Sequence, residues 1–138
     1  MEFIAGLKPK ITGKVNKFIP SCIYSSPQVA SIGITEQEAI SRNRSIKVGK
    51  FSLSANGKAL ALNEPDGFVK TIFDSKTGEI LGAHMIGAEV TELINTFSLA
   101  MKLEATEEDI ISTIFPHPTL SESIHESVLN AYDRSIHS

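Results

Sequence analysis

The sequence predicts an α+β domain, in which an antiparallel sheet carries helices packed on one face. Alternating and β-branched stretches, which are typical of strands, occupy much of residues 29–87. From residue 89 onward the apolar side chains recur at the period of a helix. A Gly-containing loop, "SKTG" (75–78), joins two of the strand-like stretches, as in a β-hairpin. Strands first and helices afterwards therefore indicate the α+β class.

Residues 29–87 are predicted to hold four strands and one short helix. The strands are recognised by β-branched content or by apolar–polar alternation, over 29–34, 46–53, 68–74 and 79–87. Thr35 and Glu38 of "TEQE" fit a capping box, which opens a helix over 36–41. The segment 54–67 contains Asn-Gly and Pro-Asp-Gly, so that turns are expected there.

Three helices are predicted after the last strand. Residues 89–103 are amphipathic, because apolar side chains recur at helical spacing at Val90, Leu93, Ile94, Phe97 and Met101. Thr106 caps a short helix over 107–112. The last helix is expected to begin near Leu120 and to end at about Tyr132, with one apolar side.

The composition describes one folded domain and excludes several classes of protein. With 138 residues, 41% hydrophobic and 21% charged, the chain is long enough to bury a core. A net charge of −3 without a basic face argues against a nucleic-acid partner. The apolar runs are too short to cross a bilayer and the N-terminus lacks a signal peptide, so we expect no membrane partner and a cytoplasmic location. The single cysteine, Cys22, excludes an internal disulfide and predicts a small buried residue in or near a strand.

The stretch "FPHPTLSESIHES" (115–127) holds the candidate functional residues and allows three interpretations. In the first, "TLSE" is a capping box with Thr119 as N-cap and Glu122 at the third helical position. In the second, Glu122 and His125 have the Glu-x-x-His spacing of carboxylate-bridged metal sites. Such sites take matching pairs from other helices, and the sequence contains no second Glu-x-x-His. A metal site is therefore not predicted.

The third interpretation is an acid–base pair of His117 and Glu122. Prolines on both sides of His117 restrict the backbone from which its side chain is aimed. Histidine exchanges protons near neutral pH, and a carboxylate on its other ring nitrogen fixes the tautomer and stabilises the imidazolium. The chain offers no evident nucleophile, because Ser121 and Ser123 lack a G-x-S-x-G turn and Cys22 is not in a reactive context. The reacting partner is expected outside this chain.

Four segments carry a resemblance that accounts for this incomplete pair. "HPTLSE" (117–122) resembles the C-terminal signature of the flavoprotein disulfide reductases, in particular the dihydrolipoamide dehydrogenases. Three further segments resemble the interface domain of that family, namely "IPSCIYSSPQVASIGITEQEA" (19–39), "KVGKFSLSANGKAL" (47–60) and "GEILGAHMIGAEVTELI" (78–94). Leu120 favours the lipoamide enzymes over glutathione and trypanothione reductases. Two departures are Cys22, where an aliphatic residue is usual, and "FP" before His117, where many members have "HA".

The resemblance implies that residues 10–138 are a C-terminal dimerisation domain, and that 1–9 are the tail of a preceding FAD-domain helix with its linker. Intact enzymes of the family bind FAD and NAD in two N-terminal domains, which also carry the redox cysteine pair. This sequence has neither G-x-G-x-x-G nor two cysteines. We therefore expect the chain to bind no cofactor and to be inactive by itself. A homodimer is implied, and lipoyl domains of 2-oxo acid dehydrogenase complexes are the implied partners of the intact enzyme.

The resemblance also implies roles for three residues in such a dimer. His117 takes the proton of a dihydrolipoamide thiol, so that the thiolate can attack the partner subunit's disulfide. Glu122 orients and charges His117. The His117–Pro118 peptide is expected to be cis, with the His117 carbonyl near the partner subunit's flavin. Two alternatives stay open, a stand-alone interaction domain of the same fold and the interface domain of another disulfide reductase, such as glutathione reductase.

Overall fold

The α+β class is confirmed by the computed structural model, which describes residues 19–137 and the isolated Gly6. Along the chain the elements are β1 (Ser21–Ile23), β2 (Gln28–Gly33), α1 (Glu36–Ser41), β3 (Ile46–Ser52), the 3-10 turn η2 (Leu53–Ala55), α2 (Gly57–Ala61), β4 (Phe68–Asp74), β5 (Ile80–Gly87), α3 (Val90–Lys102), α4 (Glu107–Ile111) and α5 (Glu122–Ala131). The helix tail and linker expected over 1–9, and the boundary between 1–9 and 10–138, fall, apart from Gly6, outside the described residues.

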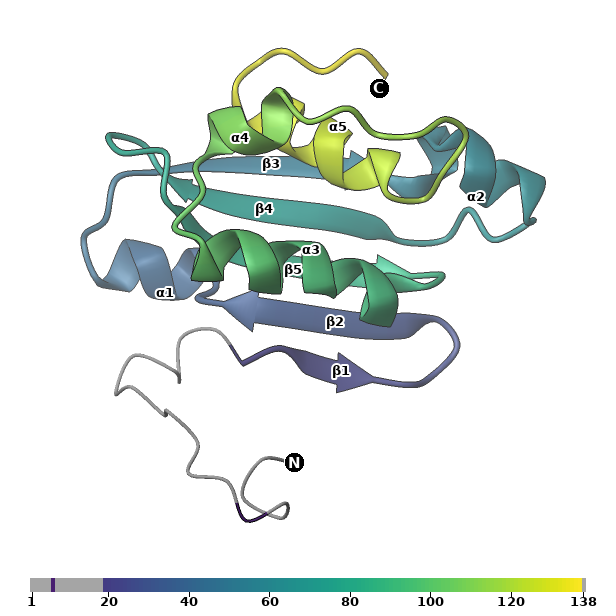
Figure 1. Cartoon of the computed structure of the whole chain (residues 1–138), viewed down its shortest axis with the longest axis horizontal. Coiled ribbons are helices and arrows are strands. Elements are labelled where there is room, and N and C mark those ends of the chain that lie inside the picture. Colours follow the sequence, from purple (N-terminus) through teal and green to yellow (C-terminus); the bar gives the residue numbers. More distant parts are fainter. Residues whose placement is uncertain (1–5, 7–18, 138) are drawn as a thin grey trace.

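Five strands form one antiparallel sheet in the order β1-β2-β5-β4-β3 (Figure 1). The predicted hairpin is confirmed, because β4 pairs with β5 from Phe68 opposite Ile86 to Phe73 opposite Ile80. β3 pairs with the other side of β4, and β2 pairs with the other side of β5. The hairpin therefore forms the centre of the sheet, and the two earlier long strands flank it.

The core lies between one face of the sheet and the helices that follow it in the chain. α3 lies against β2 and β5, and α5 lies against β3 and β4. The buried side chains that meet there come from the strands at Ala30, Ile32, Val69, Phe73, Ala83 and Met85, and from the helices at Val90, Ile94, Phe97, Met101, Ile124 and Val128. The two predicted periodicities, two in strands and 3.6 in helices, thus place their apolar residues in one layer.

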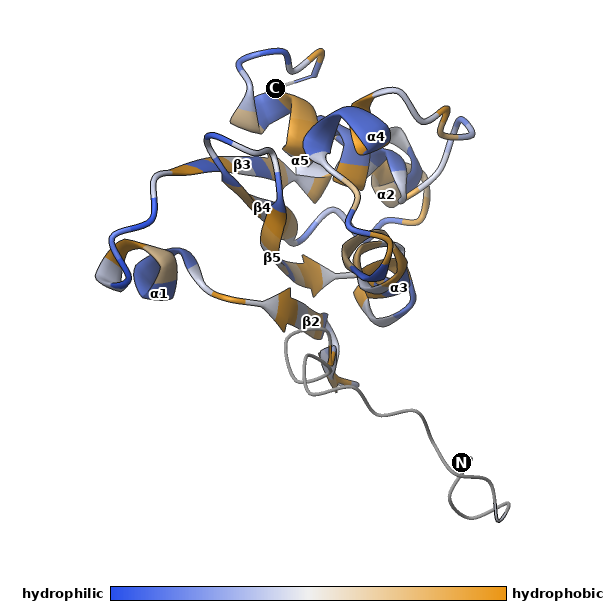
Figure 2. Cartoon of the chain, turned by 60° about the vertical axis from the view of Figure 1, so that its left-hand side comes forward, coloured by the Kyte–Doolittle hydropathy of each residue, from blue (hydrophilic) through white to orange (hydrophobic). Residues whose placement is uncertain are grey.

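Helix α1 lies on the opposite face of the sheet from α3, α4 and α5 (Figure 2). The side chain of Thr71 in β4 reaches α5, where it hydrogen-bonds Ser127. Because side chains alternate along a strand, Lys70 points to the other face, and its ammonium pairs with Glu36 at the start of α1. The helices on one face are therefore the three that follow the hairpin, with α1 as an addition behind the sheet.

Two elements were not foreseen as such. The segment 54–67, expected to form turns, contains helix α2, because Asn56 acts as an N-cap and its side-chain oxygen accepts from the N–H groups of Lys58 and Ala59. Asn-Gly was therefore a helix start and not a hairpin turn. The short edge strand β1 holds Cys22, which is partly buried and packs against the core, as predicted for a residue in or near a strand. None of the helices in the described residues has both the length and the apolar character of a membrane span.

Candidate active site

The loop before α5 presents His117 toward solvent. The His117–Pro118 peptide bond is cis, as the resemblance implied. The hydroxyl of Thr119 donates to the carbonyl of Pro116 over 2.8 Å, which closes the loop around His117. The side chain of His117 is 78% exposed. The loop therefore holds the imidazole at the surface, where a group from outside this chain could reach it.

Glu122 joins the imidazole to the start of α5. Its Oε1 lies 2.9 Å from Nδ1 of His117, and its Oε2 accepts the N–H of Thr119 over 2.8 Å. The carboxylate is 29% exposed, much less than the imidazole. Partial burial raises the pKa of Glu122, but the Thr119 N–H and the His117 ring lower it by more, so the pKa lies below its ordinary value. Glu122 is thus held as an acceptor on the inner side of the imidazole.

The capping box predicted for "TLSE" is wrong in its positions, because Ser121 and not Thr119 is the N-cap of α5, and Glu122 is the first helical residue. The Glu122 carboxylate does accept the backbone N–H of Thr119, as in a capping box. The Thr119 hydroxyl, however, is used by Pro116 and not by the helix. The first turn of α5 is instead closed by backbone bonds from Ser123 to Leu120 and from Ile124 to Ser121. The loop has taken the threonine side chain that a full box would need.

Helix α5 is fixed on the sheet by contacts that the motif does not predict. A Cβ added at Gly49 of β3 would lie 1.8 Å from the carbonyl oxygen of Ser127, so the helix backbone touches the strand at this glycine. The hydroxyls of Thr71 and Ser127 are 2.9 Å apart in the same buried region. Asn130 accepts the N–H of Lys50 over 3.0 Å. These contacts set the position of α5, and with it the position of Glu122.

The side chain of His125 contacts the 111–115 loop and not the Glu122 carboxylate. Its Nε2 lies 3.1 Å from the carbonyl oxygen of Ile111, and its ring stacks on Phe115 with centroids 5.1 Å apart. Within residues 19–137, no group of three or more His, Cys, Asp or Glu side chains is placed to hold a metal ion. The Glu-x-x-His spacing is therefore explained by packing of α5 against the 111–115 loop.

The serines of the motif are occupied elsewhere. Ser121 donates to the hydroxyl of Thr119, and the buried Ser123 donates to the carbonyl of Leu120. Cys22 lies on the edge strand β1, at the opposite side of the sheet from β3 and α5. The structure therefore brings His117 and Glu122 together and brings none of these three potential nucleophiles to them.

A recess beside the pair contains residues that the sequence interpretation missed. It is lined by His117 and Glu122 and, on its other sides, by Asn56, His125, Glu126 and His137. Asn56 donates to the carbonyl of Thr119 over 3.1 Å and so connects α2 to the loop. Glu126 follows Glu122 by four residues, a spacing that puts both on one helical face and could have drawn attention to it. Nothing in the sequence signals His137.

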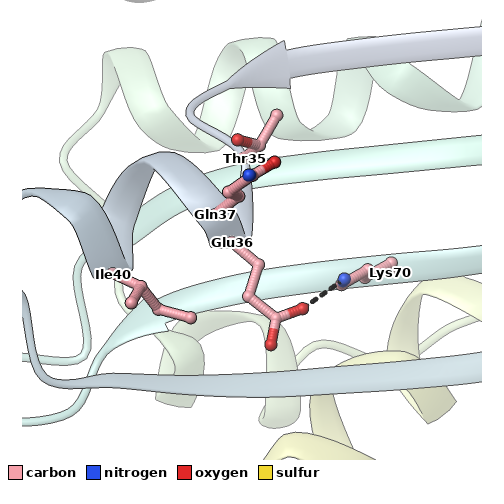
Figure 3. A pocket seen from close by; sticks show the side chains of 5 residues that line it. All are labelled: Thr35, Glu36, Gln37, Ile40 and Lys70. Atoms are coloured by element: carbon pink, nitrogen blue, oxygen red, sulfur yellow. Dashed lines mark hydrogen bonds and ion pairs between the residues drawn. The ribbon is translucent and has the colours of Figure 1, made fainter.

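A second recess lies on the other face of the sheet, between α1 and β4 (Figure 3). It is lined by Thr35, Glu36, Gln37, Ile40 and Lys70. In Figure 3 the carboxylate of Glu36 reaches across to the ammonium of Lys70, and the two groups form an ion pair with each other. This recess therefore has no base or nucleophile comparable to the exposed imidazole of His117.

Comparison with known families agrees with this geometry. Residues 19–128 match the family described as pyridine nucleotide-disulphide oxidoreductase, dimerisation domain. The chain belongs to this family. The match covers every strand and most of α5, including His117 and Glu122.

Curated relatives in bacteria are similar over almost the whole chain. A dihydrolipoyl dehydrogenase of Rhizobium etli is 58% identical over 97% of this chain, and one of Bacillus subtilis is 48% identical over 99% of it. In each case the match covers 28% of the relative. The chain therefore spans less than a third of the length of the curated relatives it matches.

Solved structures show the same fold. The flavoprotein disulfide reductase RclA from Escherichia coli superposes with a TM-score of 0.82 at 27% identity, over 92% of this chain and 29% of RclA. LpdA from Mycobacterium tuberculosis superposes with a TM-score of 0.80 at 20% identity, over 92% of this chain and 27% of LpdA. The sheet with its three helices is thus the fold of a domain in disulfide reductases.

Proposed function

We propose that this chain is the dimerisation domain of a dihydrolipoyl dehydrogenase and that it supplies His117 and Glu122 to the partner subunit's redox disulfide. The observation that carries the proposal is the pair itself, with Nδ1 of an exposed imidazole 2.9 Å from a partly buried carboxylate. The names of the relatives point to the same reaction. The missing nucleophile is explained if the disulfide belongs to another domain.

The geometry provides a base with a defined tautomer. If the Nδ1–H group of His117 donates a hydrogen bond to Glu122, then Nε2 carries the lone pair and can accept a proton. That proton would come from the thiol of dihydrolipoamide. The resulting thiolate would attack one sulfur of the disulfide, and the other sulfur would leave as a thiolate. Glu122 would stabilise the imidazolium formed in this step.

Cofactors enter the proposal only through the intact enzyme. FAD and NAD would carry the electrons there, bound by domains whose fingerprint this sequence lacks. The part of this chain that would face the flavin is the exposed loop at His117 and Pro118. The exposure of His117 fits a group that approaches from another subunit. A lipoyl domain would deliver the substrate, and the enzyme would work in the cytoplasm.

Self-association of this domain is part of the same proposal. Leu99 of α3 and Leu103, which directly follows that helix, are both exposed, and Ile114 in the loop before His117 is 94% exposed. Large apolar side chains at a surface are favoured where a partner covers them. Analytical ultracentrifugation of the 138-residue chain should show a dimer at high concentration, and a monomer at all concentrations would count against the homodimer.

The decisive experiment is His117→Gln in a complete enzyme that carries this domain. Loss of a general base lowers turnover of dihydrolipoamide by roughly 10²–10⁴-fold, while the fold is retained. His84→Gln is the matched control, because the His84 ring contacts the carbonyl of Ile34 across the sheet. Near-normal turnover of the His117→Gln enzyme would remove the proposed role. The isolated chain should be colourless and without diaphorase activity.

A further inference from the structure

The acid–base pair leaves a second buried carboxylate unexplained, that of Glu126. This residue is only 6% exposed although it carries a charge. Its Oε2 accepts the N–H groups of Ile136 and His137 over 3.1 and 3.2 Å. Its Oε1 lies 2.8 Å from Nδ1 of His137. A buried carboxylate is tolerated when donors satisfy it, and here all three donors come from one segment.

That segment, residues 134–137, is folded back along α5 by these bonds. Arg134 adds a looser contact, with its Nη1 3.5 Å from the carboxylate of the exposed Glu108. The backbone N–H of Arg134 donates to the carbonyl of Leu129 over 2.9 Å at the start of the segment. Beyond it, the bonds to the buried carboxylate of Glu126 hold residues 136 and 137. Residues 134–137, hereafter the tail segment, are therefore fastened at their far end by one side chain of α5.

The fastening places a second imidazole beside the pair. His137 lines the same recess as His117 and Glu122. The titratable side chains around this recess are those of His117, Glu122, His125, Glu126 and His137, whereas β3, α2 and the 111–115 loop contribute uncharged side chains. Glu126 is one helical turn beyond Glu122, so a bare carboxylate there would oppose ionisation of Glu122. The His137 side chain contacts Glu126 and is among the groups that lower the pKa of Glu122, after the Thr119 N–H and the His117 ring.

We propose that Glu126 is a positioning residue for the His117–Glu122 pair, because it fastens the tail segment and thereby holds the imidazole of His137 in the recess that the pair lines. This inference rests on the proposed function only in so far as the His117–Glu122 pair is taken to be catalytic. The attachment and the electrostatic effect exist in the 138-residue chain without substrate or cofactor. Both can be measured there.

The attachment is tested by amide hydrogen exchange. In Glu126→Ala the N–H groups of Ile136 and His137 lose their acceptor, so their exchange should accelerate on the order of tenfold or more. His137→Gln should leave these two amides protected, because Glu126 remains. Glu64→Gln is the control, since Glu64 is exposed. Unchanged exchange in a folded Glu126→Ala chain would overturn the proposal; if that variant fails to fold, Glu126→Gln is measured instead and should still exchange faster.

The electrostatic effect is tested by NMR titration of the Glu122 carboxyl group. His137→Gln removes the imidazole and its contact with Oε1 of Glu126, so the midpoint of Glu122 should rise. Glu126→Gln removes the positioning and the repulsion together, so its midpoint should rise less. A midpoint that His137→Gln leaves unchanged, or that rises more in Glu126→Gln, would overturn the proposal. Neither result would touch the proposed function, which the His117→Gln enzyme tests independently.

Discussion

Two helices of this domain start within the same motif and use it differently. The motif is a threonine followed three residues later by glutamate, "TEQE" at α1 and "TLSE" at α5. Thr35 is the N-cap of α1, whereas α5 begins only at Glu122, the last residue of its motif. At α1 the hydroxyl of Thr35 accepts the N–H of Glu38, and the Glu38 carboxylate pairs with Arg42 one turn further along. At α5 the Glu122 carboxylate accepts the N–H of Thr119 and faces His117. Thus α1 keeps the N-cap half of a capping box, whereas at α5 the glutamate accepts the threonine N–H from the first helical position.

A helix-start motif therefore determines where a glutamate lies but not which groups its carboxylate contacts. At α1 the threonine hydroxyl accepts from the helix, and Arg42 pairs with the glutamate at the surface. At α5 the loop takes the threonine hydroxyl, and the carboxylate turns back to cap the backbone. The glutamate of α5 is thereby held next to an imidazole with no cation of the same helix to occupy it.

The largest expected effect separates the two glutamates by function. In a complete enzyme carrying this domain, Glu122→Gln should lower dihydrolipoamide turnover by roughly 10²-fold, because the imidazolium loses its counter-charge. Glu38→Gln should leave turnover unchanged, since it removes only an exposed ion pair. Steady-state kinetics of both variants decide the matter. Equal losses of turnover in the two variants would show that Glu122 has no functional role beyond that of Glu38.

The next effect tests the contact that positions α5 on β3, at Gly49. Gly49→Ala should lower the free energy of unfolding by about 1–3 kcal/mol, because the new methyl group would collide with the backbone of α5 at Ser127. Gly57→Ala is the matched control, since a Cβ there meets nothing within 4 Å. Chemical denaturation measures both changes. A neutral Gly49→Ala would mean that α5 moves freely on β3.

A smaller effect tests the role of the threonine in each motif. Thr35→Ala should lower the free energy of unfolding by about 1 kcal/mol, the usual cost of losing an N-cap side chain. Thr119→Ala should cost about 0.5 kcal/mol, because its backbone N–H keeps the bond to Glu122. Denaturant titrations of the two variants give the comparison. The reverse order would contradict the assignment of Thr35, and not Thr119, as an N-cap.

The smallest effect concerns acid. The folded-state pKa of Glu122 lies below its ordinary value near 4.5, so its ionised form stabilises the fold above that value. This contribution is lost as the pH falls from about 4.5 through the lower folded-state pKa. Glu122→Gln should remove this part of the acid dependence, as measured by denaturation at several pH values. Identical pH profiles for both chains would show that Glu122 is not held as described.

Much of the architecture could be predicted because it follows from local patterns. The hairpin of β4 and β5, the amphipathic α3 and the start of α1 are dictated by periodicity, turn residues and caps. Helix α2 was missed because Asn56-Gly57 is a signal for a turn and for a helix start alike. Asn56 also donates to the carbonyl of Thr119, a residue distant in sequence, and no local pattern reveals this contact.

The closeness of His117 and Glu122 could be predicted from the sequence alone, since Glu122 follows His117 by five positions at a helix start and prolines flank His117. Only the tertiary structure decided which residue is the N-cap of α5, how α5 sits on Gly49, and that Glu126 fastens a tail segment with its own histidine. The physical reason is the distance along the chain over which each interaction acts. Backbone preferences and periodicity act within a few residues, whereas the partner of a side chain depends on whichever distant segment packs against it.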